Sequence, residues 1–298
     1  MSANAISLGA MNESLTDELR YLERPDGRIS YTVTGDGPLI VAVPGMGDLR
    51  ATYRSLVPQL VASGYRVAVT DVRGHGDSDT SFRVHGDDAT GRDLIALVEE
   101  LGGGPAVILG NSMGASSAAW AAAERPDVVA GLVLISPFMR NRPMPKAMAA
   151  ILSGGYRLLL SGPWGPGAWA GYYDKTLNRG TQPSGHAEHV ADIRSSLKEP
   201  GRLREFRELA MQLDHGVVEA RIDEIHTPAI IVVGELDPDY ADPAAELTWM
   251  GEQIDAETVL VPDAAHYPQS QRPELVAPPV VAFLDGLRTA DGWRAPGA

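Results

Sequence analysis

One serine in this chain stands in a context suited to attack on a carbonyl group. Ser112 lies at the centre of Gly110-Asn111-Ser112-Met113-Gly114, directly after the apolar run 106–109 and before the small-residue stretch 115–123. The run predicts a buried strand and the small-residue stretch a helix, so the serine sits at the apex of a strand–turn–helix. The flanking glycines suit a turn that is too tight for side chains. This pattern indicates an exposed serine nucleophile.

A serine hydroxyl is a poor nucleophile near neutral pH, so it needs a base to take its proton and an acid to orient that base. Asp237 follows the apolar run 229–233, and His266 follows the strand-like segment 258–261. The order nucleophile, acid, histidine fits a catalytic triad in which the acid orients the base. Asp239 lies two residues beyond Asp237 in the same loop and is the alternative acid.

The elements around these residues alternate between strand-like and helix-like patterns. Such alternation predicts an α/β fold built on a mostly parallel, doubly wound sheet. The carboxyl ends of its strands would bring the serine, acid and histidine to one edge. Strands are expected at 20–24, 28–34, 39–43, 65–70, 105–109, 131–135, 229–233 and 258–261, and helices at 50–63, 88–101, 115–124 and 273–287.

No strand-like run occurs between residues 137 and 225, which we call the insertion. Helical patterns are expected there at 144–160, 185–197 and 202–213, and the composition of 162–167 indicates an irregular loop. The predicted organisation is a tail at 1–20, a core domain at 21–136 and 226–290, and the helical insertion at 137–225.

Composition narrows the functional classes. The 298 residues carry a formal net charge of −14, which disfavours nucleic acid as a partner. There is no apolar run of membrane-spanning length and no basic, apolar leader, so neither a membrane protein nor a secreted one is indicated. The absence of cysteine excludes disulfides and thiolate chemistry and agrees with a cytoplasmic location. No phosphate-binding glycine motif follows a strand, so no cofactor is expected.

Five motifs in this order resemble those of the α/β-hydrolase superfamily, over about 22–287. They are Pro44-Gly45-Met46-Gly47, the run Asp71-Val72-Arg73-Gly74-His75-Gly76-Asp77-Ser78, the Ser112 turn, Gly234-x-x-Asp237, and His266 before the last helix. The resemblance implies that Ser112 is the nucleophile, His266 the base and Asp237 the acid. It also implies that backbone amides of Met46 and Met113 form the oxyanion hole. Many relatives carry His-Gly where this chain has Pro44-Gly45.

The remaining histidines and one further acid have simpler interpretations. His75 and Asp71 are expected to be structural, with Asp71 buried. His85, His215 and His226 are expected to be solvated.

His186 and His189 are spaced so that they share a helix face with Glu188 and Asp192. We interpret these two as surface histidines. A metal site there is a minor alternative, and no metal site is expected.

In this superfamily such an insertion forms a lid over the serine. Its apolar side chains would favour an apolar or aromatic portion of the substrate, and we expect them to set substrate choice while the core performs the chemistry. Most of them are expected to be the lid's own core, but Trp164, Trp169, Tyr172 and Tyr173 are candidate substrate contacts. The apolar set is Met144, Met148, Leu152, Trp164, Trp169, Tyr172 and Tyr173.

The function expected from these features is hydrolysis of a carboxylic ester of a small, partly apolar molecule through an acyl-serine intermediate. The turn Gly110–Gly114 also resembles that of the meta-cleavage product hydrolases, so hydrolysis of a carbon–carbon bond is an alternative. A cofactor-free perhydrolase and a non-catalytic small-molecule receptor are further alternatives. The oligomeric state is not indicated by the sequence.

Overall fold

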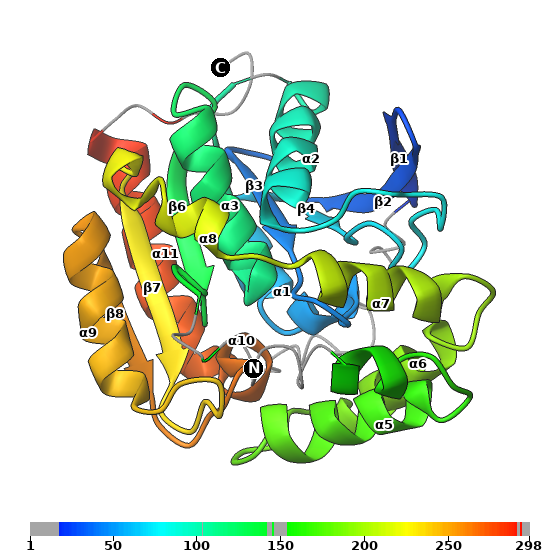
Figure 1. Cartoon of the computed structure of the whole chain (residues 1–298). Coiled ribbons are helices and arrows are strands. Elements are labelled where there is room, and N and C mark those ends of the chain that lie inside the picture. Colours follow the sequence, from blue (N-terminus) through cyan, green and yellow to red (C-terminus); the bar gives the residue numbers. More distant parts are fainter. Residues whose placement is uncertain (1–17, 103, 142–144, 146–153, 291–292, 294–298) are drawn as a thin grey trace, which may run out of the picture.

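A single sheet of eight strands forms the centre of the protein, with the order β1-β2-β4-β3-β5-β6-β7-β8 (Figure 1). The computed structural model describes residues 18–102, 104–141, 145, 154–290 and 293. The two N-terminal strands run antiparallel and the others are parallel, which confirms the predicted α/β architecture. The strands are β1 (Arg20–Arg24), β2 (Gly27–Thr34), β3 (Leu39–Val43), β4 (Arg66–Thr70), β5 (Ala106–Asn111), β6 (Val129–Ile135), β7 (Ala229–Gly234) and β8 (Glu257–Val261).

Helices cover both faces of the sheet, which explains why the central strands are continuously apolar. In β3 the side chains alternate between two cores: Val41 packs on the face covered by α2 (Asp87–Glu100), α3 (Met113–Glu124) and α9 (Pro243–Ile254). Ile40 packs on the opposite face under α1 (Val57–Ala62) and α11 (Pro273–Ala290). A strand buried on both faces needs apolar residues at every position.

Several elements differ from the sequence expectations. The helix expected at 50–63 is divided into the 3-10 turn η2 (Arg50–Tyr53) and α1, because Pro58 lacks the N–H that a continuous helix needs and favours a helix start. Within the segment 162–167, which was expected to be an irregular loop, a helix begins at Gly165. Helix α9 was not expected, although Asp242 caps it through the Ala245 amide.

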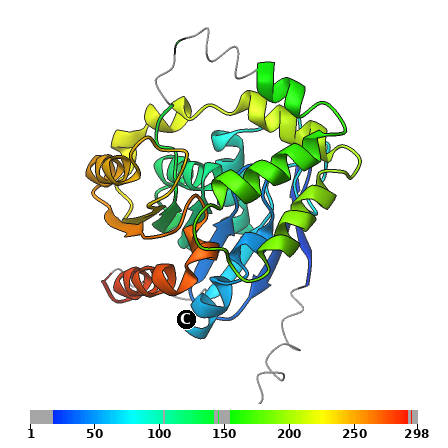
Figure 2. The same ribbon diagram turned by 90° about the horizontal axis from the view of Figure 1, so that it is seen from below.

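The insertion leaves the sheet after β6 and returns at β7. Its helices α5 (Gly165–Tyr172), α6 (His186–Ser196) and α7 (Arg202–Gln212) lie together at one edge of the sheet, as Figures 1 and 2 show. The short elements η3 (Tyr173–Leu177), α8 (Gly216–Glu219) and η4 (Ile222–Glu224) complete it, with α10 (Pro268–Gln271) following β8 in the core. Met144, Met148, Leu152 and the tail up to residue 17 lie outside the described residues.

The insertion has a small apolar core of its own. This core joins α5, η3, α6 and α7 and also includes Tyr267 of the core domain. The insertion is therefore packed against the strand-end loops.

In the described part of the chain, no helix combines the length and apolarity that a membrane crossing requires.

Candidate active site

The turn at Ser112 is held in a conformation that only its flanking glycines permit. Ser112 has φ 55° and ψ −125°, between β5 and α3, and its side chain is half-buried. A Cβ atom on Gly110 would lie 2.4 Å from the Ala115 nitrogen, and one on Gly114 would lie 2.6 Å from the Pro44 carbonyl oxygen. A positive φ at a non-glycine residue stores strain and is found at functional sites.

The loop after β3 lies directly against this turn. A Cβ atom on Gly45 would come within 2.8 Å of the Ser112 Cβ, so only glycine allows the approach. Met46 follows in the same loop, and Met113 opens α3. Both methionines line the same cavity as Ser112.

His266 and Asp237 form a buried pair at the ends of β8 and β7. The Nδ1 atom of His266 lies 2.9 Å from Oδ2 of Asp237, and both side chains are almost fully buried. Burial disfavours the charged imidazole, but the charge and hydrogen bond of Asp237 outweigh it and raise the pKa of His266 to about 9. Conversely, although burial acts to raise it, the pKa of Asp237 is lowered by His266.

The two candidate acids differ in geometry. The second oxygen of Asp237 accepts the Asp239 amide at 2.9 Å, which fixes the carboxylate in its loop. Asp239 itself is 3.4 Å from His266 Nδ1 and its side chain is 23% exposed, against 0% for Asp237. The shorter distance and full burial favour Asp237 as the orienting acid.

These three side chains also form a group of potential metal ligands. Among the described residues, Asp237, Asp239 and His266 place ligand atoms within 4.8 Å of one another. The Nδ1 atom of His266, however, is already bonded to Asp237. The arrangement thus matches the acid–histidine pair of a triad.

A cavity of about 490 Å³ opens beside Ser112 and His266. Trp169 and Tyr172 of the insertion line it, whereas Trp164 and Tyr173 do not. Trp164 is 55% exposed at the start of α5, and Tyr173 is buried toward the loop after β3. The lining is mainly apolar: Met46, Ser112, Met113, Phe138, Arg140, Asn141, Tyr156, Trp169, Tyr172, Leu177, Ala210, Leu213, His215, Asp239, His266 and Tyr267.

Hydrogen bonds hold the loop after β3 on two sides at Gly47. The Gly47 N–H donates to Nε2 of His75 at 3.1 Å, and the Trp169 indole N–H donates to the Gly47 carbonyl at 2.8 Å. Burial lowers the pKa of His75 to about 4, which keeps the ring neutral and able to accept. Gly47 has φ +75°, and a Cβ there would lie 2.5 Å from the indole.

The next residue, Asp48, is bonded to the insertion. Its fully buried carboxylate lies 2.7 Å from Nε2 of His189 and 3.3 Å from the Tyr173 hydroxyl. The expectation that His189 is a surface histidine is therefore wrong, because α6 turns it inward. His186, three residues earlier, contacts Asp174 instead, so the two histidines face different carboxylates.

Two other histidines also differ from expectation, while His226 is exposed as predicted. His85 is buried beside Glu205, 3.4 Å away. His215 is half-buried, pairs with Asp87 at 2.7 Å and lines the cavity. The surrounding sequence is polar in both cases. His85 is covered by α7, and the His215 ring stacks on Phe138 at 4.8 Å between centroids.

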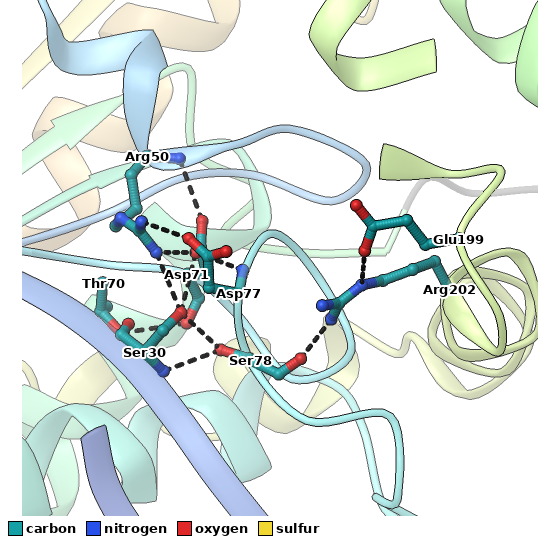
Figure 3. Close-up of polar contacts among 8 residues, drawn as sticks. All are labelled: Ser30, Arg50, Thr70, Asp71, Asp77, Ser78, Glu199 and Arg202. Atoms are coloured by element: carbon teal, nitrogen blue, oxygen red, sulfur yellow. Dashed lines mark hydrogen bonds and ion pairs between the residues drawn. The ribbon is translucent and has the colours of Figure 1, made fainter. Parts of the chain in front are cut away.

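Asp71 is buried and structural, as its motif implied. Its carboxylate accepts hydrogen bonds from the Arg50 guanidinium, the Ser30 hydroxyl at 2.8 Å and the Asp77 amide at 3.1 Å (Figure 3). Burial raises the pKa of Asp71, and Arg50 opposes this effect. The network fixes the loop after β4 to β2.

The insertion contacts this network and also the loop that carries His266. Arg202 at the start of α7 donates to the Ser78 carbonyl and pairs with Glu199 (Figure 3). On the other side, the Leu177 carbonyl accepts the His266 amide at 3.0 Å. The insertion is therefore bonded to loops that carry the candidate site.

The fold and this arrangement define a hydrolase with an α/β core. A sequence profile of the alpha/beta hydrolase family matches residues 40–278, and the chain belongs to that family. A 2-(acetamidomethylene)succinate hydrolase from Mesorhizobium japonicum is 26% identical over 279 residues, which cover 87% of this chain and 93% of that protein. A thermophilic esterase from Thermogutta terrifontis, solved with malate bound, has a TM-score of 0.73 at 25% identity and covers 91% of this chain and 100% of its own.

A further relative is similar over a shorter stretch. A 2-hydroxy-6-oxononadienedioate/2-hydroxy-6-oxononatrienedioate hydrolase 2 from Pseudomonas putida is 36% identical over 145 residues, 44% of this chain and 49% of that protein.

Sequence reasoning did not find the residues that hold the loop after β3. Asp48 and His189 are separated by 141 positions, and nothing local connects them. The available signal was an acidic residue immediately after the Pro44–Gly47 motif, which would be buried beside the turn.

Proposed function

We propose that this protein is a serine hydrolase that cleaves carboxylic esters of small, partly apolar molecules. The observation that carries the proposal is the buried His266–Asp237 pair, whose imidazole lines the same cavity as Ser112. A strained serine, a histidine and an orienting carboxylate are the parts needed for acyl transfer.

The reaction follows from these positions. His266 takes the proton of the Ser112 hydroxyl as the oxygen attacks the ester carbonyl. The amides of Met46 and Met113 stabilise the negative oxygen that forms. His266 then protonates the leaving alcohol, and a water molecule activated by the same histidine hydrolyses the acyl-serine. Asp237 keeps Nδ1 protonated, so that Nε2 is free to accept.

The cavity supports an apolar acyl or alcohol portion. Phe138, Leu213 and Trp169 contribute apolar surface, and the volume of about 490 Å³ is that of a small-molecule site. Among the described residues of the lining, the one arginine is Arg140, which is paired with Glu246 at 2.8 Å and lies over the Trp249 ring. A neutral ester therefore suits this cavity better than a polyanion.

Carbon–carbon bond hydrolysis is the second candidate. It is supported by the Pseudomonas putida relative and by the similarity of the turn Gly110–Gly114 to that of meta-cleavage product hydrolases. The Pro44-Gly45 sequence, in place of His-Gly, counts against it. Turnover of an aromatic-derived diketone acid in preference to esters would select this reaction.

The test is hydrolysis of p-nitrophenyl esters of graded length by the wild type and by Ser112→Ala. We expect the alanine variant to lose at least about 10⁴-fold in kcat, because the oxyanion hole alone cannot replace covalent catalysis. A fluorophosphonate should label Ser112 in the wild type. An active alanine variant, or labelling of another serine, would refute the mechanism, and ligand binding without turnover would identify a receptor.

A further inference from the structure

The loop that carries the Met46 amide is fixed by residues of the insertion as well as by the core. At Gly47 the core supplies His75, which accepts the N–H, and the insertion supplies Trp169, which donates to the carbonyl. Both polar groups of this residue are thus bonded, and its φ of +75° is held from both sides. The Met46 N–H belongs to the Gly45–Met46 peptide, which directly precedes the peptide that carries the Gly47 N–H.

Asp48 adds a second attachment on the other side of Gly47. One carboxylate oxygen receives the Leu49 amide at 2.8 Å and His189 at 2.7 Å, and the other receives the Tyr173 hydroxyl at 3.3 Å. Asp48 and His189 are 0% and 3% exposed in their side chains, so solvent cannot replace either partner. Hydrogen bonds to a buried charged group are among the stronger ones in proteins.

We propose that His189 and Trp169 are positioning residues of the oxyanion hole. They act through Asp48 and Gly47 and hold the Met46 amide against Ser112. This inference rests on the proposed function, since the direction of that amide affects the rate only if an oxyanion forms beside it. It also reassigns part of the insertion from substrate choice to chemistry.

The expected effect follows from how sensitive oxyanion holes are to geometry. Loss of one donor costs about 10²- to 10³-fold in kcat, and a displacement of about 1 Å can cost about 10²-fold. Removal of His189 would leave Asp48 buried with fewer donors, so its carboxylate would turn and take the loop with it. We expect a decrease of roughly 10- to 100-fold in kcat.

The experiment compares His189→Leu with His186→Leu. Both histidines lie on α6 and pair with a carboxylate, but His186 contacts Asp174 within the insertion and not the loop after β3. A p-nitrophenyl acetate assay gives kcat and KM, and the inhibition constant of phenylboronic acid reports on the tetrahedral adduct at Ser112. We expect His189→Leu to lower kcat and the affinity for phenylboronic acid by similar factors, while KM changes less than about 3-fold. His186→Leu should keep kcat and the affinity for phenylboronic acid close to the wild-type values.

Two further variants separate positioning from folding. His189→Gln keeps an N–H that can reach Asp48 and should recover most of kcat. Trp169→Phe keeps a ring against Phe206, 4.7 Å away between centroids, but loses the donor to Gly47. Trp169→Phe should lower both kcat for the small acetate ester and the affinity for phenylboronic acid. If His189→Leu does not fold, this variant tests the positioning role in its place.

The results also distinguish this inference from the proposed function. If the fluorophosphonate does not label wild-type Ser112, the serine mechanism itself has failed. If Ser112 is labelled but His189→Leu and Trp169→Phe keep the wild-type kcat and boronic acid affinity, only the positioning role is refuted. Equal losses in His189→Leu and His186→Leu would likewise refute it.

Discussion

Replacement of Asp237 by asparagine should reverse the tautomer of His266, the proposed catalytic base. In the wild type, one carboxylate oxygen accepts the Asp239 amide at 2.9 Å and the other faces His266 Nδ1 at 2.9 Å. An asparagine in this place keeps its oxygen toward the Asp239 amide, because only oxygen can accept that N–H. Its NH₂ group then points at Nδ1, and the ring must carry its proton on Nε2.

The size of the effect follows from this exchange. With Nε2 protonated, His266 cannot take the proton of Ser112, and by analogy with serine proteases the loss in kcat is about 10⁴-fold. Such a loss corresponds to about 5.4 kcal/mol in activation free energy. The fold should persist, since the asparagine has the same shape, keeps the bond from the Asp239 amide and replaces the bond to Nδ1 by one of reversed direction.

Asp239→Asn is the matched control. Asp239 is partly exposed and 3.4 Å from Nδ1, so its charge is screened and its loss should change kcat by roughly 5-fold or less. The assay is p-nitrophenyl acetate hydrolysis by both variants at saturating substrate, with circular dichroism to verify folding. A large loss in Asp239→Asn together with a small loss in Asp237→Asn would mean that Asp239 is the orienting acid.

Two other predictions concern pH and substrate size. Because catalysis needs neutral His266 and its pKa is raised, kcat/KM should rise with pH through a limb that lies above 6.5, the ordinary histidine value, and Asp239→Asn should shift this limb to lower pH. A flat profile from pH 5 to 9, with chemistry rate-limiting, would exclude His266 as the base. Tyr172→Ala should lower the ratio of kcat/KM for a bulky over an acetate ester by roughly 10-fold, whereas Trp164→Ala, outside the cavity, should not. An unchanged ratio in Tyr172→Ala would show that its contact is not used.

The sheet could be predicted from the sequence because its strands are marked locally. Strands buried on both faces read as continuous apolar runs, such as Leu39–Val43 and Ala229–Gly234. The turn at Ser112 was marked by its glycines, which the close backbone approaches require. His266 and Asp237 were each placed by a strand end, and parallel strands bring such ends to one edge of the sheet.

Features that depend on packing between distant elements were not predictable. His189 lies in a helical segment whose sequence is mostly polar. Its side chain is buried against Asp48 only because α6 packs on the loop after β3. The start of α5 could not be predicted from its composition, because Gly165 and Pro166 favour a loop in isolation. Packing of Trp169 against Phe206 stabilises the helix. Helix α9 did carry a local signal, Asp242 followed by Pro243, which could have been used.

The buried contact between Asp48 and His189 limits how this family member can be recombined. An insertion from a relative that has no donor at the position of His189 would leave Asp48 buried with fewer hydrogen bonds. Loss of a partner of a buried polar group costs about 1–3 kcal/mol, and more when the group is charged. Chimeras would then lose stability and turnover together, whichever substrate the new segment accommodates. The loop after β3 and helix α6 therefore depend on each other, and they should be exchanged together when the specificity of this scaffold is redesigned.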